Sequence, residues 1–469
     1  MRFFLLTAGI LCAGIVIAPL PERLLQTAAT LRDGLRSGQG GARIARDLAD
    51  RAGHRLAGSP GSAAARRWAL EEMRALGFEH VREEKVLEPH WERGVETAEL
   101  VPGGPALAVA ALGGSGPTPA GGLARPVVVV RNVEALSALV AREPDAVADR
   151  IVFFTERMER TRDGSGYGRT VSIRFRGPAE ARKAGAAGVL IRSVGTSASR
   201  FPHTGTTALE PGEPPFPAAA LAYADADRLE QLSAAGPVTV RLTLGCRWRS
   251  EVEGANVVGE LEGASRPEEI VLLAAHLDAW DVGSGAIDDA AGVGVVCETL
   301  RAIGALAARP RRTVRVVLFA NEENGSRGAK AYVEAHAAEL RRHVLALEID
   351  LGTDPVYRIS SITGAEGREA ISAMRTLLAP LGVSESADDT DGGADTGTLR
   401  PFGVPMIELD QDATRYFDFH HSAEDTVDRI DPAHLAQVTA ATAVVAYVAA
   451  ESPGTLGRIP EEKRARKEH

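Results

Sequence analysis

Cysteine is scarce in this sequence: three of the 469 residues are cysteine, and none lies in a CxxC pair or a Cys/His cluster. This excludes a disulfide-built scaffold and a cysteine-based metal site, so a metal would have to be held by histidine and carboxylate side chains. Positive charge is also in deficit. The net charge is −10 and no basic stretch is interleaved with aromatic residues, which argues against nucleic acid as a partner.

The N-terminus carries a long apolar run. Arg2 precedes an apolar segment from Phe3 to Ala18, and Pro19 follows it. A run of this length is short for a membrane-spanning helix and is typical of a secretory signal peptide. We therefore predict an exported protein, periplasmic or secreted, with residues 1–18 as its signal. An uncleaved membrane anchor is the alternative, because Pro19 makes cleavage after Ala18 unfavourable. Export would let Cys246 and Cys297 form a disulfide, and the sequence does not decide whether they meet.

Strand and helix patterns divide the remaining chain into two α/β parts. After residue 256, strands are expected at 270–275, 313–320, 344–349 and 404–409, and helices at 291–306, 329–341 and 432–450. Such alternation predicts a mainly parallel, mixed sheet sandwiched by helices. The pattern from 21 to 76 is largely helical, most clearly over 63–76, and Gly and Pro are frequent from 103 to 125. A second βαβ segment follows without clustered carboxylates, which predicts a separate, non-catalytic lobe.

These shifts predict four parts after the signal peptide. Residues 20–121 would form the N-terminal part of the main domain, 122–245 an inserted lobe, 246–455 the catalytic remainder of the main domain, and 456–469 a charged tail, which is expected to be frayed over 461–469.

One stretch, residues 269–300, concentrates the polar chemistry of the chain: EIVLLAAHLDAWDVGSGAIDDAAGVGVVCETL. It begins as an apolar strand and then places His276, Asp278, Asp281, Asp288 and Asp289 in the following loop. Ligands bind at the carboxyl ends of strands in an open α/β sheet. Four carboxylates and an imidazole gathered there are costly to desolvate without a compensating positive charge, for which a divalent metal is the simplest source.

Acidic and imidazole side chains also follow three later strands. Glu322 and Glu323 follow the strand that ends at 320, Asp350 follows the next strand, and His420 and His421 lie beyond the strand at 404–409. Imidazole and carboxylate are the ligands that catalytic zinc uses, and two metals can share one carboxylate. A hydrolase needs one more carboxylate as general base, and adjacent Glu322 and Glu323 can divide the roles of base and ligand.

With these motifs the chain resembles the co-catalytic zinc aminopeptidases and carboxypeptidases, the clan of bacterial leucyl aminopeptidase and glutamate carboxypeptidase. HLDAWDVGSGAIDD, NEENG and HHSAEDTVD match the three site motifs of that family. The resemblance extends over nearly the full length and is strongest to the branch of plasma carboxypeptidase Q and its bacterial homologues. It implies the zinc-exopeptidase fold, short peptide substrates and a homodimer. Residues 122–245, with GPAEARKAGAAGVLI and PHTG, resemble the protease-associated domain inserted into such enzymes.

The resemblance also implies a role for each motif residue, with two Zn²⁺ per subunit. His276 and Asp350 would bind one zinc, His421 and Glu323 the other, and Asp288 would bridge them. Glu322 would be the general base, taking a proton from the attacking water and later giving it to the leaving amine. Asp278 would orient the ring of His276. In such enzymes the peptide bond between Asp288 and Asp289 is strained.

Several neighbouring residues have two readings. We prefer His421 over His420 as ligand because family ligands directly precede Ser or Thr, here Ser422, and we predict that His420 donates a hydrogen bond to the tetrahedral intermediate. By resemblance, Asp395 borders the substrate pocket and contacts a substrate amine; a solvated turn is the alternative. The remaining expectations concern helix capping by Asp281 and Asp289, local backbone capping by Asp425, and Trp280 as a wall of the site.

The sequence thus predicts an exported di-zinc exopeptidase that cleaves dipeptides or the N-terminal residue of short peptides. Two alternatives remain: a one-zinc acyltransferase like glutaminyl cyclase, which shares the fold, and a receptor-like relative without catalysis. The complete ligand set argues against the receptor, because such relatives lose ligands. The sequence does not distinguish amino- from carboxypeptidase selectivity, nor does it identify the preferred side chain.

Overall fold

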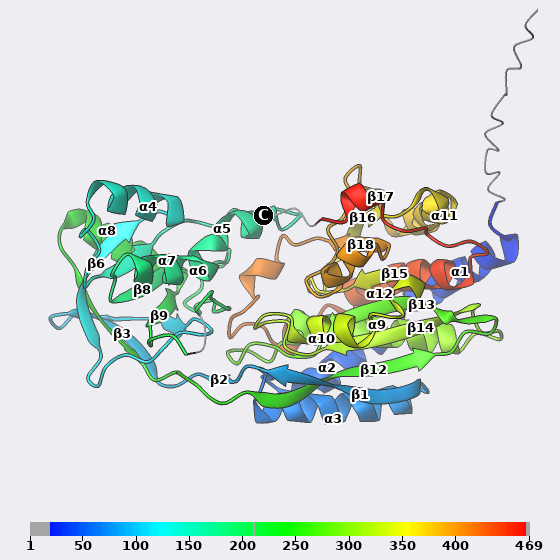
Figure 1. Cartoon of the computed structure of the whole chain (residues 1–469), viewed down its shortest axis with the longest axis horizontal. Coiled ribbons are helices and arrows are strands. Elements are labelled where there is room, and N and C mark those ends of the chain that lie inside the picture. The colour runs from blue at the N-terminus through cyan, green and yellow to red at the C-terminus, as the bar shows by residue number, and fades with distance from the viewer. Residues whose placement is uncertain (1–18, 210–211, 466–469) are drawn as a thin grey trace, which may run out of the picture.

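Two eight-stranded sheets, one in each of two lobes, organise the chain (Figure 1). The computed structural model describes residues 19–209 and 212–465, so the predicted signal peptide lies outside the described residues. The larger unit is called the main lobe here. The smaller unit, from Glu96 to Leu244, is called the inserted lobe because the main lobe supplies the chain on both sides of it.

The main sheet combines a parallel centre with antiparallel edges. Its order is β1 (Glu79–Glu88), β12 (Val252–Leu261), β14 (Arg312–Phe319), β13 (Arg266–His276), β15 (His343–Glu348), β18 (Met406–Gln411), β16 (Val356–Ile362) and β17 (Ser384–Glu385). Strands β14, β13, β15 and β18 pair in parallel, whereas β1 with β12, β12 with β14 and β18 with β16 pair in antiparallel fashion; the edge strand β17 runs parallel to β16. Residues 271–275 of β13 are fully buried, as expected of a central strand covered on both faces. The predicted mixed, mainly parallel sheet is confirmed.

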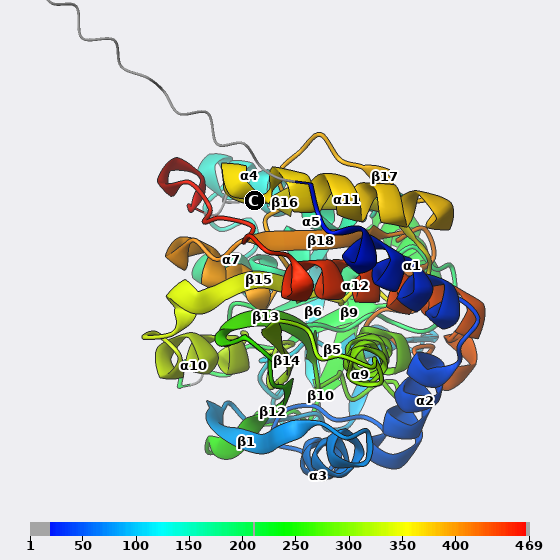
Figure 2. The same ribbon diagram turned by 90° about the vertical axis from the view of Figure 1, so that its right-hand side faces the viewer.

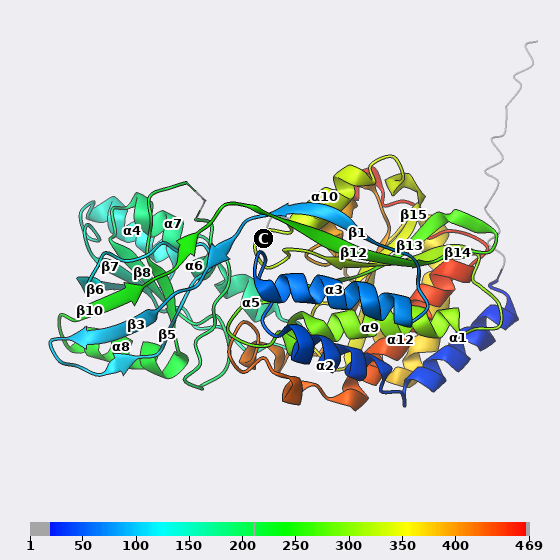
Figure 3. The ribbon, with the colours of Figure 1, turned by 90° about the horizontal axis from the view of Figure 1, so that it is seen from below.

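Helices cover both faces of this sheet (Figures 2 and 3). One face carries α1 (Glu22–Leu35), α2 (Gly40–Ala52), α3 (Pro60–Ala75), α9 (Ala291–Gly304), α11 (Arg368–Leu378) and α12 (Pro432–Glu451). The other face carries α10 (Arg327–Ala335) and the turn η5 (Thr396–Phe402). Helix α3 begins three residues before its predicted start, because Ser59 accepts a hydrogen bond from the Ser62 N–H and Pro60 fits the first turn.

Helix α12 is a largely buried helix of the main lobe. Among the described residues, it is the one helix that is long and apolar enough, by length and composition, to cross a membrane. However, 83% of its apolar window is buried inside the protein. It packs against α1 and α9 on the same face of the sheet, which is the environment of a core helix.

The inserted lobe has its own mixed sheet. The strand order is β4 (Ala106–Leu107), β3 (Glu96–Val101), β10 (Thr239–Leu244), β6 (Leu123–Val130), β7 (Ile151–Phe154), β8 (Gly188–Arg192), β9 (Ala218–Leu221) and β5 (Val109–Ala111). Its helices are α4 (Val133–Arg142), α5 (Ser165–Thr170), α6 (Ser172–Phe175), α7 (Gly177–Lys183) and α8 (Tyr223–Ala235). A two-stranded ribbon, β2 (Trp91–Glu92) with β11 (Arg247–Trp248), lies where the chain passes between the lobes, as the position of β2 in Figure 1 shows.

Two sequence-based boundaries need correction. The predicted start of the insertion at 122 is too late, because β3, β4 and β5 pair within the second sheet and the Gly/Pro-rich stretch lies inside this lobe. The charged tail, expected to be frayed over 461–469, is held in place at Lys463, whose carbonyl accepts from Arg400 at 2.8 Å. Cys246 and Cys297 are both free and buried within the described chain, so they do not pair.

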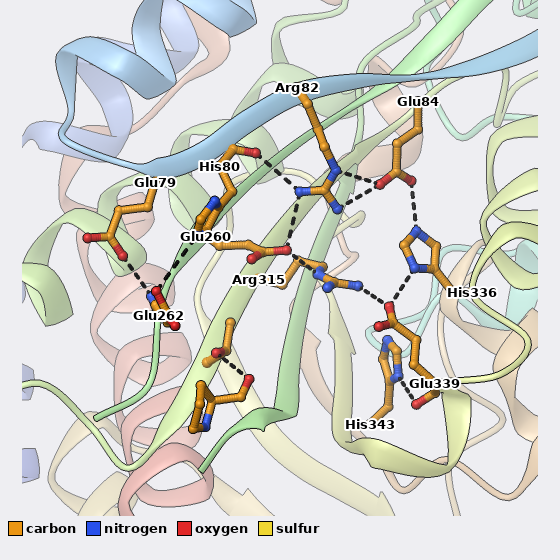
Figure 4. Close-up of polar contacts among 12 residues, drawn as sticks. Glu79, His80, Arg82, Glu84, Glu260, Glu262, Arg315, His336, Glu339 and His343 are labelled. Atoms are coloured by element: carbon orange, nitrogen blue, oxygen red, sulfur yellow. Dashed lines mark hydrogen bonds and ion pairs between the residues drawn. The ribbon is translucent and has the colours of Figure 1, made fainter. Parts of the chain in front are cut away.

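A buried network of charged side chains ties the outer strands of the main sheet to α10 (Figure 4). Arg315 on β14 lies 2.7 Å from Glu260 and 2.7 Å from Glu339. His336 on α10 bridges Glu339 and Glu84, at 2.5 and 2.9 Å. Acidic and basic groups therefore alternate through this cluster, which we call the paired network.

Candidate metal centre

The first half of the centre is built at the carboxyl end of β13. His276 is the last residue of this strand, and Asp288 lies in the single turn η1 (Ala286–Ala290), where the Asp288–Asp289 peptide bond is cis. Between them the chain is clamped by the fully buried Arg55. Its guanidinium donates to the carbonyls of Leu277, Ser284 and Gly285 at 2.6, 2.7 and 2.8 Å. The loop that aims Asp288 is thus fixed by a residue from the α2–α3 connection.

Two groups of metal-ligating side chains meet at Asp288. One consists of His276, Asp288 and Asp350; the other consists of Asp288, His420 and His421, and in each group the ligand atoms lie within 4.8 Å of one another. The Oδ1 atom of Asp288 faces the first group, 3.1 Å from His276 Nε2, and Oδ2 faces the second, 3.3 Å from His421 Nε2. The two oxygens of one carboxylate therefore point into two adjacent positions.

Glu323 and His420 both border the second position. Glu323 Oε2 lies 2.9 Å from His421 Nε2, whereas His420 Nε2 lies 3.7 Å from Asp288 Oδ2. The two imidazole rings are stacked with their centroids 3.5 Å apart. The structure thus brings together all five residues that the sequence predicts as ligands, and it places His420 beside them.

The site holds more negative charge than its protein neighbours neutralise. Within the described chain, Asp288 Oδ2, Glu323 Oε1 and Asp278 Oδ2 are buried without a hydrogen-bond partner. Burial raises the pKa of Asp350 to about 7, against the opposing charge of His276. Burial together with neighbouring acids also raises the pKa values of Glu322 and Glu323. Such a cluster fits a bound divalent cation, which would satisfy the unpartnered oxygens.

Asp278 has a wider role than the predicted one. The Nδ1 atom of His276 lies 3.1 Å from the main-chain carbonyl of Asp278 and 3.7 Å from its carboxylate. That carboxylate instead accepts from the backbone N–H of Glu322 at 3.0 Å. Asp278 therefore orients His276 through its backbone and fixes Glu322 through its side chain.

A cavity of about 370 Å³ opens onto these residues. Glu322, Asp288 and Asp350 line it from the main lobe, and Tyr167 and Arg174 line it from the inserted lobe. The inserted lobe, predicted to be separate from the site, therefore lines the same cavity as the predicted ligands. None of its carboxylates lines this cavity, but the guanidinium of Arg174 and the phenol of Tyr167 do.

Asp395 lies beside this cavity without lining it. The neighbouring Ala394 is part of the cavity wall, whereas Asp395 is fully buried and both of its carboxylate oxygens lack a hydrogen-bond partner among the described residues. Burial, and then the charge of Glu348, raise the pKa of Asp395 well above its usual range. The alternative of a solvated turn is thereby excluded for this residue.

The predicted capping roles have mixed outcomes. Asp289 does cap α9, accepting from the Gly292 N–H at 2.9 Å. Asp281 does not cap a helix: Arg93, from the chain before β3, binds its carboxylate at 2.7 Å. Asp425 binds the Ile287 N–H at 2.8 Å, so it holds the turn of Asp288 and not its own local backbone. Trp280 lines a small cavity beside Asp288 and Glu323 as predicted.

Arg55, Arg174 and Tyr167 escaped sequence reasoning. Their contacts with the metal centre join segments that lie far apart in the chain; for example, 247 residues separate Arg174 from His421. A usable signal was present for Arg174, since it lies just before the GPAEARKAGAAGVLI segment that marks the insertion.

Comparisons with known proteins agree with this geometry. The profile described as Peptidase family M28 matches residues 256–446. Carboxypeptidase Q of Rattus norvegicus is 36% identical over 413 residues, which cover 88% of this chain and 85% of that protein. The human protein of the same name is 34% identical with the same coverage. The range matched by the family profile, 256–446, includes every candidate ligand from His276 to His421.

Solved structures show the same arrangement of strands and helices. The peptidase M28 precursor of Shewanella amazonensis superposes with a TM-score of 0.90 at 40% identity, covering 94% of this chain and 99% of that one. The zinc aminopeptidase BSAP of Bacillus subtilis shares the fold at 20% identity, with a TM-score of 0.64 and coverage of 90% and 98%.

Proposed function

This chain belongs to peptidase family M28, and we propose that it is an exported di-zinc exopeptidase that hydrolyses dipeptides or removes the N-terminal residue of short peptides. The observation that carries the proposal is the position of Asp288, whose two oxygens face two adjacent groups of metal-ligating residues. Similarity to carboxypeptidase Q and to a zinc aminopeptidase supports exopeptidase chemistry.

The residues of the site fit two zinc ions. His276 and Asp350 would hold one ion, His421 and Glu323 the other, and Asp288 both. When bound, zinc supplies a Lewis acid that polarises the scissile carbonyl and activates the attacking water. Histidine and carboxylate donors with room left for substrate are the ligand set of catalytic zinc sites, and the unpartnered oxygens of Asp288 and Glu323 support this assignment.

Glu322 is the general base of the proposed reaction. It lines the same cavity as Asp288 and Asp350, and the Asp278 carboxylate fixes its backbone. From there its carboxylate takes the proton of the attacking water and passes it to the leaving amine, which departs from the other side of the broken peptide bond.

The substrate termini are recognised by opposite charges. Acidic groups that line the cavity, among them Glu322 and Asp350, favour a protonated amino terminus near the candidate metal positions. Arg174 offers the opposite charge. It is 4% exposed and lines the cavity, and its Nε atom has no hydrogen-bond partner among residues 19–209 and 212–465.

The contacts of Arg174 leave it free to bind an anion. Its Nη2 donates to the Tyr167 hydroxyl at 2.5 Å, and its Nη1 lies 3.4 Å from the Thr204 carbonyl and 3.3 Å from His421 Nδ1. If Nε2 of His421 faces a metal, Nδ1 carries a hydrogen and cannot accept from Arg174. A buried guanidinium without an anion is costly, so Arg174 fits the free carboxylate of a dipeptide. In a dipeptide this carboxylate belongs to the residue that directly follows the scissile bond. Because consecutive Cα atoms lie about 3.8 Å apart, the carboxylate stays close to that bond.

Metal analysis and substrate comparison test this function together. The purified chain should contain two zinc ions, lose hydrolysis on chelation and regain it with added zinc. A single tightly bound zinc without peptidase activity would instead fit the glutaminyl cyclase-like alternative. The predicted export and homodimer remain separate predictions.

A dipeptide and its C-terminal amide form the matched substrate pair. Because a hydrogen bond to a charged group contributes about 1.5–3 kcal/mol, kcat/KM should favour the free acid by about tenfold or more. Arg174→Met should abolish this preference. The control Arg176→Met should keep it, because Arg176 is exposed and lies 3.6 Å from Glu134. Equal rates of the wild type on acid and amide would contradict carboxylate recognition without contradicting zinc-dependent hydrolysis.

A further inference from the structure

The loop that carries His420 and His421 is held from outside by one turn of the inserted lobe. The backbone N–H of Thr204 donates to the His421 carbonyl at 2.9 Å. The ring of His203 donates from Nδ1 to the His420 carbonyl at 2.6 Å. His203 and Thr204 belong to the PHTG segment, which the sequence marks as part of the insertion and to which the proposed reaction assigns no role.

His421 needs such support because its backbone is left-handed. Its φ angle is +59°, a region that costs a non-glycine residue about 1–2 kcal/mol. The loop supplies part of the support itself, since the N–H of His420 donates to Tyr416 and that of Ser422 to Phe419. The carbonyls of His420 and His421, however, are both bound by the inserted lobe.

The contact with Thr204 also orients the imidazole ring of His421. Its Nδ1 lies 3.3 Å from the Thr204 carbonyl, while Nε2 lies 2.9 Å from Glu323 and 3.3 Å from Asp288. Thr204 therefore contacts His421 twice, donating to its carbonyl and accepting from its ring. Metal-binding histidines depend on such a partner at the second ring nitrogen to fix tautomer and ring orientation.

His203 is itself rigidly placed, so it can act as a fixed point. It is 2% exposed, and its backbone N–H donates to the Ser193 hydroxyl at 2.8 Å. The ring lies against Gly195, where an added Cβ would come within 2.6 Å of ring atom Cε1. A carbonyl oxygen can only accept, so Nδ1 carries the hydrogen that binds His420.

We propose that the turn of His203 and Thr204 is the outer support of the second metal position, so that the inserted lobe completes the metal centre by positioning His421. This inference rests on the proposed di-zinc function. His203 is a positioning residue: it acts on the ligand through the backbone and touches no reacting atom.

Zinc affinity of the full-length protein tests the inference independently of activity. His203→Leu removes the donor to His420 and should weaken the second zinc by about 10–100-fold, while the first zinc stays bound. His203→Asn should largely restore binding, because its side-chain amide nitrogen can take the place of Nδ1. The measurement is equilibrium dialysis in zinc buffers followed by metal analysis of the protein.

A second buried histidine provides the matched control. His343 is also fully buried, but it lies at the start of β15 beside the paired network, where its ring contacts the Tyr332 hydroxyl and the Glu339 carbonyl, so His343→Leu should leave both zinc affinities at the wild-type value. The inference is overturned if His203→Leu binds both ions as the wild type does, or if the Asn variant is as impaired as the Leu variant. A wild type that binds fewer than two zinc ions contradicts the di-zinc function instead. In that case the inference holds only if His203→Leu weakens binding of the zinc ion that remains; unchanged affinity for that ion overturns it.

Discussion

The paired network and the metal centre are two buried clusters of charge in the same lobe, and they differ in how their acids are neutralised. In the network of Figure 4, Glu339 has Arg315 and His336 as partners at 2.7 and 2.5 Å. In the metal centre, Glu323 has one imidazole at 2.9 Å, and its second oxygen has no hydrogen-bond partner within the described residues. Burial alone would raise the pKa of both glutamates.

The outcome differs because of the partners. Arg315 and His336 outweigh burial and lower the pKa of Glu339, whereas burial prevails at Glu323 and raises its pKa. The two clusters also occupy different parts of the sheet: His343 begins β15 near the network, and Asp350 follows the end of that strand in the metal centre. A self-neutralised cluster stabilises the fold, and one left with excess charge at the carboxyl ends of strands is a binding site.

Exchanging one glutamate in each cluster gives the largest expected contrast. Glu322→Gln should lower kcat by about 10²–10⁴-fold, because the amide cannot take the proton of the attacking water, and zinc content should not change. Glu339→Gln should leave kcat within about twofold and lower the denaturation midpoint instead. Steady-state kinetics and metal analysis of both variants measure this. Near wild-type turnover of Glu322→Gln would show that Glu322 is not the base.

The next experiment distinguishes two roles for His420, a metal ligand and a hydrogen-bond donor to the transition state. If it donates to the tetrahedral intermediate, His420→Phe should lower kcat by about 10²–10³-fold with two zinc ions still bound. Loss of one zinc from this variant would instead make His420 a ligand, in keeping with its place in the group of Asp288 and His421. Metal content and single-turnover rates, measured on the same preparation, separate the two roles.

Breaking the paired network should affect stability and leave chemistry intact. Arg315→Met removes the guanidinium that lies between Glu260 and Glu339, and uncompensated buried acids should cost about 3 kcal/mol. Both acids keep a second basic partner, which places the loss at the lower end of the range for buried pairs. Denaturant unfolding measures the loss, and zinc content with kcat serves as the control. A stable variant that loses zinc would contradict the separation of the two clusters.

A pH dependence of stability is expected from His343. Burial, and then the charge of Arg315, lower its pKa to about 4, and Tyr332 lies 2.9 Å from its Nε2. In the unfolded chain the pKa is about 6.5, so the unfolded state binds more protons below that pH. The free energy of unfolding should therefore fall between pH 6.5 and 4, by up to about 1.4 kcal/mol per pH unit. Unfolding curves of the wild type should lose more stability over this window than those of His343→Leu; parallel curves would exclude the effect.

Local sequence patterns were sufficient to predict a helix cap made by a nearby residue but not an ion pair between distant segments. The cap of Asp289 spans three residues, from its own carboxylate to the N–H of Gly292, and such caps have a sequence signature. The partner of Asp281 is Arg93, 188 residues away, and no periodicity connects them. The same sequence reading therefore succeeded at one aspartate and failed at the other.

The sequence by itself determined the four central strands of the main sheet, the strand ends and following loops that carry His276, Asp288, Glu323, Asp350 and His421, and the chemistry of those side chains. It could do so because strand and helix periods are local, and because parallel strands bring their carboxyl ends to one edge. Only the tertiary structure decided that Arg55, Arg174 and His203 complete the site. Arg174 contacts His421, 247 residues away, and His203 contacts His420, 217 residues away. Arg55, in the α2–α3 loop, contacts Leu277, just after β13. Packing of whole elements creates these contacts, and no local sequence pattern marks them.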